Sequence, residues 1–314
     1  MSTLFVFGNG FDLQHNLPTR YDPDLKILAI AAERFSGEWE SYSVGGDLWS
    51  DVEEQLAHPD VDLVLEHLGG YSPDLLSDRE SDRDGIIHEA EQLLTFPLEE
   101  FAQNADDKLQ DVLPKPMFSD LFGPDDYFLT FNYTHTLQHL YDVDPSRILH
   151  LHGEVGVSRL ILGYAPGSLQ GTGSLRQYDD EENYEHYHSQ AYGAFAQLLA
   201  DFEKEYQHEA VIQFIKQLVQ PPNRVFVYGH SFGSVDKPYF EQLARSFKEV
   251  PWTVCAYNDD ALDDVCSALD AYALGVVYER HVLSKRSGFA RLSAAFGSPT
   301  IPSALLSSRD PARG

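Results

Sequence analysis

The chain has 314 residues, of which 43% are hydrophobic and 12% aromatic, enough apolar material for a packed core. Its 50 acidic residues outnumber 22 basic ones, and the resulting net charge of -28 would repel nucleic acid over most of the surface. No stretch approaches about 18 consecutive apolar residues, and the start, MSTLFVFGNG, lacks a basic leader. We therefore expect a cytoplasmic protein that binds neither nucleic acid nor a membrane.

The first strand is predicted at residues 3–7, where the apolar run STLFVFG ends in glycine. Four more runs rich in β-branched and aromatic residues end in a similar polar turn, and they predict strands at 127–131, 148–151, 225–228 and 252–256. Strands that alternate with helical patterns are typical of a parallel α/β sheet. Ligands of such sheets bind beyond the carboxyl ends of the strands, so we expect the five ends to meet at one crevice.

Between the first two predicted strands, residues 22–125 are interpreted as a large helical insertion. Apolar residues recur there at spacings of three and four in 47–58, 60–70 and 84–113. A further helix is predicted over 190–220, ahead of the fourth strand. We expect a single domain over residues 1–298, followed by a flexible tail at 299–314.

The segment after the first strand reads GNGFDLQHNLPTRY. Gly8-x-Gly10 allows a tight turn and a close approach of the backbone to a ligand, and the N–H groups that follow suit a pyrophosphate. The full G-x-G-x-x-G fingerprint is absent, because Leu13 stands three residues after Gly10. The motif alone is therefore compatible with a structural turn as well as with a phosphate loop.

Gly229, Ser231 and Gly233 follow the fourth predicted strand in the G-x-S-x-G order of a serine hydrolase's nucleophile elbow. In such an elbow the helix begins directly after the nucleophile. Here Asp236 is predicted to be the N-cap of the next helix, with Pro238 in its first turn, so Ser231 lies upstream in a loop.

The hydrolase alternative would use Ser231 as nucleophile, His281 as base, and Asp259 or Asp260 to orient the base. It leaves the glycine motif after the first strand unexplained. Two cysteines, Cys255 and Cys266, are too few for a four-cysteine zinc site or a disulfide framework, and we expect buried free thiols and no metal.

Six blocks of sequence occur in a fixed order: LFVFGNGFDLQHNLPTRY, LWSDVEEQL, LTFNYTHTLQHLY, ILHLHGEV, LILGY and VFVYGHSFGSVDKPYF. Together they resemble the signature of the AbiH family of bacterial abortive-infection, phage-resistance proteins, from residue 4 to about 245. Within the second block, Trp49 is expected in the core and the carboxylates on a solvated face, Glu53 being the one that could reach a site.

The blocks also resemble the motifs of the sirtuin-like nucleotide-binding fold. Asn132 falls on the asparagine of that fold's Q-N-x-D motif, and His152 and Gly153 fall on its catalytic H-G pair. The resemblance implies a Rossmann-like, sirtuin-like and mostly parallel sheet with NAD as the substrate. It also implies nucleotide-binding residues in three loops: Gly8, Asn9, Gly10, Phe11, Asp12, Arg20, Gly229, Ser231 and Asn258.

The Phe-Arg that follows the proline in the sirtuin motifs appears here as Arg20-Tyr21, and two further positions carry other residue types than those motifs do. Asp12 stands where the glycine-rich loop has a serine, and Thr134 stands where Q-N-x-D has its aspartate. The four cysteines of the sirtuin zinc ribbon are also absent, so protein deacetylation is not expected.

With NAD across the strand ends, an asparagine and a histidine suffice to cleave the N-glycosidic bond, because nicotinamide is a good leaving group and the transition state resembles an oxocarbenium ion. Asn132 would hold the ribose or orient water, and His152 would accept a proton. Taken singly, Asn132 could instead cap the following helix, and His152 could be a hydrogen-bonded histidine at a strand end. His150 alternates with His152 along the strand, so only one of them can face the crevice.

The sequence thus predicts an anti-phage protein that hydrolyses NAD, or a related dinucleotide, to ADP-ribose and nicotinamide. The alternative is a non-catalytic sensor that binds a nucleotide or a phage component in the same crevice and acts through a partner protein. The sequence leaves open whether the chain forms a homo-oligomer.

Overall fold

The computed structural model of the chain describes residues 2–32, 40, 42–44, 46–61, 84–85, 88, 96–170, 193 and 196–283. The predicted tail at 299–314 lies outside these residues, as do most of the helix predicted at 60–70 and most of residues 84–95.

Six parallel strands form one sheet in the order β3-β2-β1-β4-β5-β6. Their bounds are Thr3–Phe7 (β1), Tyr127–Thr130 (β2), Ile148–His150 (β3), Arg224–Tyr228 (β4), Trp252–Ala256 (β5) and Tyr278–Val282 (β6). The five predicted strands are confirmed to within about a residue, and β6 is an addition that the sequence did not indicate. This order is that of doubly wound sheets, in which the direction of winding reverses between β1 and β4.

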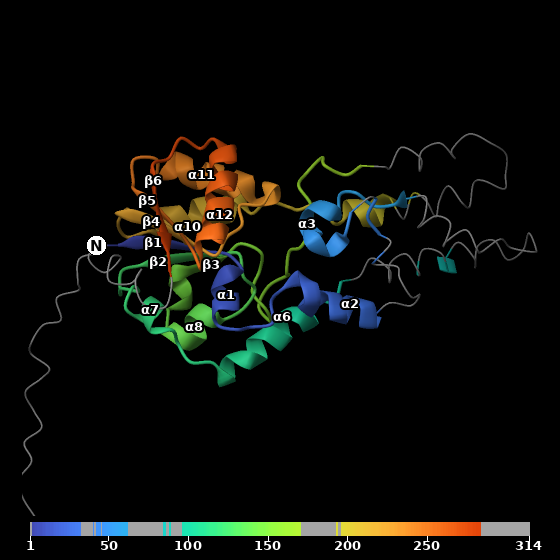
Figure 1. The fold of residues 1–314 in the computed structure, drawn as a ribbon, viewed down its shortest axis with the longest axis horizontal. Coiled ribbons are helices and arrows are strands. Elements are labelled where there is room, and N and C mark those ends of the chain that lie inside the picture. Colours follow the sequence, from blue (N-terminus) through green and yellow to red (C-terminus); the bar gives the residue numbers. More distant parts are fainter. Residues whose placement is uncertain are drawn as a thin grey trace, which may run out of the picture.

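Helices cover both faces of the sheet (Figure 1). One face packs its phenylalanines, among them Phe5 and Phe7, against three short helices: α1 (Gly10–Gln14), α7 (Pro116–Ser119) and α8 (Thr136–Tyr141). The alternate residues, among them Leu4 and Val6, pack against three longer ones: α10 (His208–Gln217), α11 (Lys237–Ser246) and α12 (Asp259–Tyr272). Burial on both faces explains why the strands read as continuous apolar runs.

The described part of the insertion has a core of its own, which contains Trp49 as expected. Its elements are a π-helical turn Tyr21–Leu25 (η1), α2 (Lys26–Ala32), α3 (Val52–Gln55), α6 (Leu98–Asp107) and the 3-10 turns Leu48–Ser50 (η2) and Lys108–Asp111 (η3). Further 3-10 turns lie at Pro145–Arg147 (η4) and Ser234–Asp236 (η6). Figure 1 shows α2, α3 and α6 beyond the carboxyl ends of the strands, on the side away from the N-terminus.

The prediction of one helix over 190–220 is wrong in its middle, because residues 201–207 leave the helical path. There the backbone pairs with Tyr164, which donates to Phe202 O at 3.0 Å and accepts from Lys204 N at 2.9 Å. This extended segment carries the Lys204 side chain into the interior, where only 2% of the residue is exposed. Helical spacing alone could not show the break, because Phe202 and Tyr206 keep the four-residue spacing of a helix across it.

Candidate functional site

The loops after β1 and β4 touch each other at the point where the sheet reverses its winding. Gly10 N donates to Gly229 O at 2.8 Å, and a Cβ on Gly10 would lie 2.5 Å from Gly229 Cα. Gly229 has φ +69°, a conformation that side-chain-bearing residues rarely adopt. The contact between the two loops therefore accounts for both glycines without a ligand.

A cavity of about 450 Å³ opens beside this contact, within the size range of small-ligand sites. Residues that follow all five predicted strands line it, so the predicted shared crevice is confirmed. The lining contains these predicted site residues: Gly8, Asn9, Gly10, Asp12, Asn132, His152, Gly229 and Ser231. Glu53 of α3 lies in the same lining, which links the insertion to the strand ends.

Three of the predicted binding residues lie elsewhere. Phe11 is in the aromatic core, stacked on Phe7 with ring centroids 4.2 Å apart. Arg20 is exposed and does not line the cavity. Asn258 caps α12, because its Oδ1 accepts from Ala261 N at 2.7 Å.

Asn132 lines the cavity beside Asp12, whose pKa its side chain lowers. The residue is 7% exposed, and its side-chain Nδ2 has no hydrogen-bond partner among the described residues. It does not cap α8, whose N-cap is His135. Since buried polar groups nearly always find a partner, this donor is one that Asp12, water or a ligand can satisfy.

Asp12 joins the loop after β1 to the loop after β2. Thr134 Oγ1 donates to Asp12 Oδ2 at 2.6 Å, and Thr136 Oγ1 donates to Oδ1 at 2.8 Å. Burial raises the pKa of Asp12 to about 6, although the two threonine hydrogen bonds and the Asn132 side chain lower it. Two of the positions that differ from the sirtuin motifs, Asp12 and Thr134, are thus hydrogen-bonded to each other.

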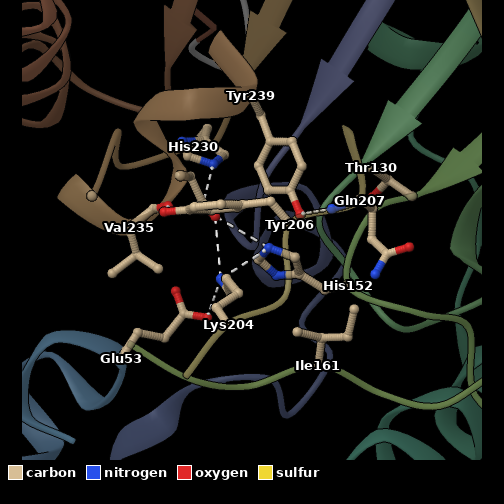
Figure 2. Close-up of polar contacts among 12 residues, drawn as sticks. Glu53, Thr130, His152, Ile161, Lys204, Tyr206, Gln207, His230, Val235 and Tyr239 are labelled. Atoms are coloured by element: carbon tan, nitrogen blue, oxygen red, sulfur yellow. Dashed lines mark hydrogen bonds and ion pairs between the residues drawn. The ribbon is translucent and has the colours of Figure 1, made fainter. Parts of the chain in front are cut away.

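In the wall of the cavity, a network of charged and polar groups surrounds Asp236, and Figure 2 labels four of them: Glu53, His152, Lys204 and His230. Its Oδ1 lies 3.1 Å from His152 Nε2 and 3.2 Å from Lys204 Nζ, and its Oδ2 lies 3.2 Å from His230 Nε2. Lys204 Nζ also lies 2.7 Å from Glu53 Oε1 and 3.1 Å from His152 Nε2. Figure 2 shows Lys204 between Glu53 and His152.

The charges in this network stabilise one another. Burial alone would raise the pKa of Asp236, but Lys204 and the two histidines hold it well below its ordinary value. Burial alone would likewise lower the pKa of Lys204, but Glu53 and Asp236 raise it above the ordinary lysine value. Both groups are therefore charged at neutral pH.

Sequence reasoning missed most of this network. It placed Asp236 correctly at the start of α11 but expected its carboxylate to cap the helix, and no such cap forms. The expectation is wrong because the carboxylate turns inward to Lys204. His230 and Lys204 carried no signal of their own, whereas Glu53 was expected on a solvated face, as the one acid of its block that could reach a site.

The groups of the hydrolase alternative are not assembled around Ser231. Its side chain makes no hydrogen bond to a histidine among the described residues, and His281 of β6 is absent from the cavity lining. His281 Nε2 instead lies 3.5 Å from Glu279 Oε2 on the same strand. Both cysteines are buried free thiols, as expected.

A protein-family model described as bacteriophage abortive infection AbiH matches residues 4–256. The chain belongs to the AbiH family. The match to AbiH runs from β1 to the last residue of β5, and so includes every strand whose end lines the cavity. None of the curated proteins matches the chain. Within the part of this AbiH chain that the structure describes, no helix has the length and apolar character to cross a bilayer.

Proposed function

We propose that this AbiH protein binds NAD, or a related dinucleotide, in the cavity at the strand ends and cleaves the bond between nicotinamide and ribose. The observation that carries the proposal is that the Asn132 side chain and the His152 ring line one cavity at the point where the winding of the sheet reverses. Doubly wound sheets bind their ligands at this point. The products would be ADP-ribose and nicotinamide, and the reaction would protect bacteria by removing NAD during infection.

The two residues have complementary roles in this reaction. Asn132 Nδ2 would donate to a ribose hydroxyl or hold the attacking water. The C1′–N bond breaks with its electron pair on nicotinamide, water oxygen bonds to C1′, and His152 takes the proton that water loses. Asp12 would keep the two loops together through Thr134 and Thr136.

The residues that line the cavity are better suited to bind a ribose than a pyrophosphate. No lysine or arginine is among the described residues that line the cavity, whereas four carboxylates are: Asp12, Asp51, Glu53 and Asp236. The N–H groups of Gly10 and Phe11, which the sequence offered to a pyrophosphate, already donate to Gly229 O and Gly8 O. We therefore expect the nicotinamide-ribose half to supply most of the binding, and nicotinamide riboside to bind about as well as NAD.

The experiment is to follow nicotinamide release from NAD by purified protein, with and without extract of phage-infected cells. Asn132→Ala and His152→Ala should each reduce turnover by about 10²-fold or more, the usual loss for a group that acts in the transition state. His139→Ala, on the exposed side of α8, is the control for histidine replacement. Ser231→Ala should mainly weaken binding.

Two results would contradict the assignment. If Asn132→Ala and His152→Ala both retain wild-type turnover and phage protection, these residues do not catalyse the reaction. If Ser231→Ala alone abolishes turnover, and a serine-reactive fluorophosphonate labels Ser231, the protein is a serine hydrolase.

A second candidate function is a sensor that binds a phage component in the same cavity and acts through a partner. The acidic lining without a cation favours a ligand that carries no phosphate. The same assay separates the two functions. A sensor would release no nicotinamide under any condition, while its ligand would still raise the melting temperature by mass action.

A further inference from the structure

The buried network holds one ring nitrogen of His152, a residue that lines the cavity, and leaves the other ring nitrogen without a described partner. Nε2 lies 3.1 Å from Asp236 Oδ1 and 3.1 Å from Lys204 Nζ. Nδ1 makes no hydrogen bond to a described residue, and Figure 2 draws contacts to only one nitrogen of this ring. A ligand would therefore meet His152 at Nδ1, and the network would decide whether that nitrogen carries a hydrogen.

Two arrangements of the neutral ring exclude each other. If Nε2 carries the hydrogen, it donates to Asp236, and Nδ1 presents a lone pair. If Nε2 is bare, it accepts from Lys204, and Nδ1 carries the hydrogen. The first arrangement makes His152 a base toward the cavity, and the second makes it a donor.

The geometries of the Asp236 carboxylate and the Lys204 ammonium group favour the arrangement in which Nε2 of His152 carries the hydrogen. With a bare Nε2, a ring lone pair would face a carboxylate lone pair at 3.1 Å, and neither planar group could turn away without losing its other contacts. An ammonium group carries three hydrogens that rotate together. Lys204 can therefore direct hydrogens to Glu53 Oε1 at 2.7 Å and Asp236 Oδ1 at 3.2 Å, both of which are stronger acceptors than a neutral ring.

His230 shows the same relation to Asp236 with no ambiguity. Its Nδ1 lies 2.8 Å from the backbone N–H of Phe232, which can only donate, so Nδ1 is bare. The hydrogen is therefore on Nε2, which donates to Asp236 Oδ2 at 3.2 Å. One carboxylate thus receives an Nε2–H from His230 and lies within reach of another from His152.

We propose that Asp236 is a positioning residue that holds His152 in the Nε2–H form, so that Nδ1 is the base that faces the cavity. The use of that base rests on the function proposed above, whereas the tautomer itself does not. In the proposed reaction, water oxygen bonds to C1′, its proton goes to Nδ1, and nicotinamide leaves with the electron pair of the C1′–N bond. The Asp236 carboxylate then stabilises the imidazolium that forms.

The test is ¹⁵N NMR of the full chain labelled at histidine nitrogens, without any ligand. His152→Gln identifies the His152 signals, and His230 supplies an internal standard for the Nε2–H form. We expect wild-type His152 to show a protonated Nε2 and a bare Nδ1. A protonated Nδ1 with a bare Nε2 would overturn the proposal, and this measurement needs no variant of Asp236 to fold.

A matched pair of variants tests the cause. Asp236→Ala leaves Lys204 next to Nε2, so the hydrogen should move to Nδ1, whereas Lys204→Met leaves Asp236 in place, so the hydrogen should stay on Nε2. The opposite pair of results would assign the control to Lys204 and refute the proposal. Retention of the Phe232-bonded His230 signal and of a cooperative melting curve establishes that each variant is folded.

Turnover separates this inference from the proposed function. Asp236→Ala should lower kcat by about 10²-fold or more with KM little changed, because a His152 ring that already carries its hydrogen on Nδ1 cannot accept the proton there. If wild-type His152 has the expected tautomer but no nicotinamide is released, the proposed function fails and the tautomer stands. If nicotinamide is released while Nδ1 is protonated, the inference fails and the proposed function stands.

Discussion

Replacing Asp12 by Asn should make the chain's stability less sensitive to pH between about 4 and 6. Burial raises the pKa of Asp12 from its ordinary 3.8 to about 6 in the folded protein. Below pH 4 the carboxyl is protonated in both states and has no effect. As the pH rises, the unfolded chain loses the proton first, so the folded state is progressively disfavoured until the pH passes 6.

The magnitude follows from the size of the shift. About two pKa units at roughly 1.4 kcal/mol each amount to a loss of about 3 kcal/mol in the free energy of unfolding across this window. Asp12 is 1% exposed, so solvent screening does not reduce the value much. Asn at this position keeps the size of the side chain and can still bond the hydroxyls of Thr134 and Thr136, which can rotate to donate or to accept.

The assay is urea unfolding of both proteins at pH 4, 5, 6 and 7, at a concentration low enough to avoid association near the isoelectric point. The quantity that matters is the difference between the two unfolding free energies, because all other titrating groups contribute equally to both proteins. This difference should shift by about 3 kcal/mol in favour of Asp12→Asn between pH 4 and 7. Parallel pH profiles would refute the reasoning. As a second check, Thr134→Val should widen the pH range over which Asp12 destabilises the fold, because it removes a hydrogen bond that lowers the pKa of Asp12.

Three further predictions concern residues outside this titration. Gly10→Ala should destabilise the fold by about 1–3 kcal/mol in urea unfolding, because its Cβ would lie 2.5 Å from Gly229 Cα. An unchanged urea midpoint would show that the loops after β1 and β4 can separate freely. Lys204→Ala should cost about 3–5 kcal/mol, because it leaves two largely buried carboxylates, those of Glu53 and Asp236, without their cation. The partly exposed Lys237→Ala should cost less than about 1 kcal/mol, and equal costs would mean that the pairs of Lys204 contribute nothing. Asn258→Ala should cost about 1 kcal/mol through the lost cap of α12, and Asn258→Asp should restore most of it; a loss of NAD binding with full stability would instead support the ribose role.

The sheet could be predicted because a parallel strand buried on both faces must be apolar along its whole length. Val225 to Tyr228 of β4 are all buried, and the run then ends at a glycine that the turn requires. The last strand lacks this signature. Tyr278–Val282 reads YERHV, and the sheet order places it at an edge with its middle residues exposed, so polar side chains are tolerated there.

The candidate site could be predicted only in part. Residues marked by the local sequence could be found, whereas contacts between residues far apart along the chain could not. Gly8, Gly229 and His152 each follow the end of a strand, a position that local sequence reveals, and the resemblance to the sirtuin motifs singled out His152. The partners of His152 were not found, since it meets Asp236 across 84 residues, and Glu53 meets Lys204 across 151. No local pattern marks a lysine as buried, because burial depends on carboxylates that other segments supply.

The same contacts change the meaning of the helical insertion. Glu53 comes from α3, yet its partner Lys204 lies 3.1 Å from His152, whose ring lines the cavity. If α3 moved away, Lys204 would lose one of its two carboxylates and would remain buried beside Asp236 and His152 alone. Since an uncompensated buried charge is costly, the position of the insertion and the electrostatics around His152 are energetically coupled. The insertion is therefore a component of the candidate site rather than an appendage to the sheet.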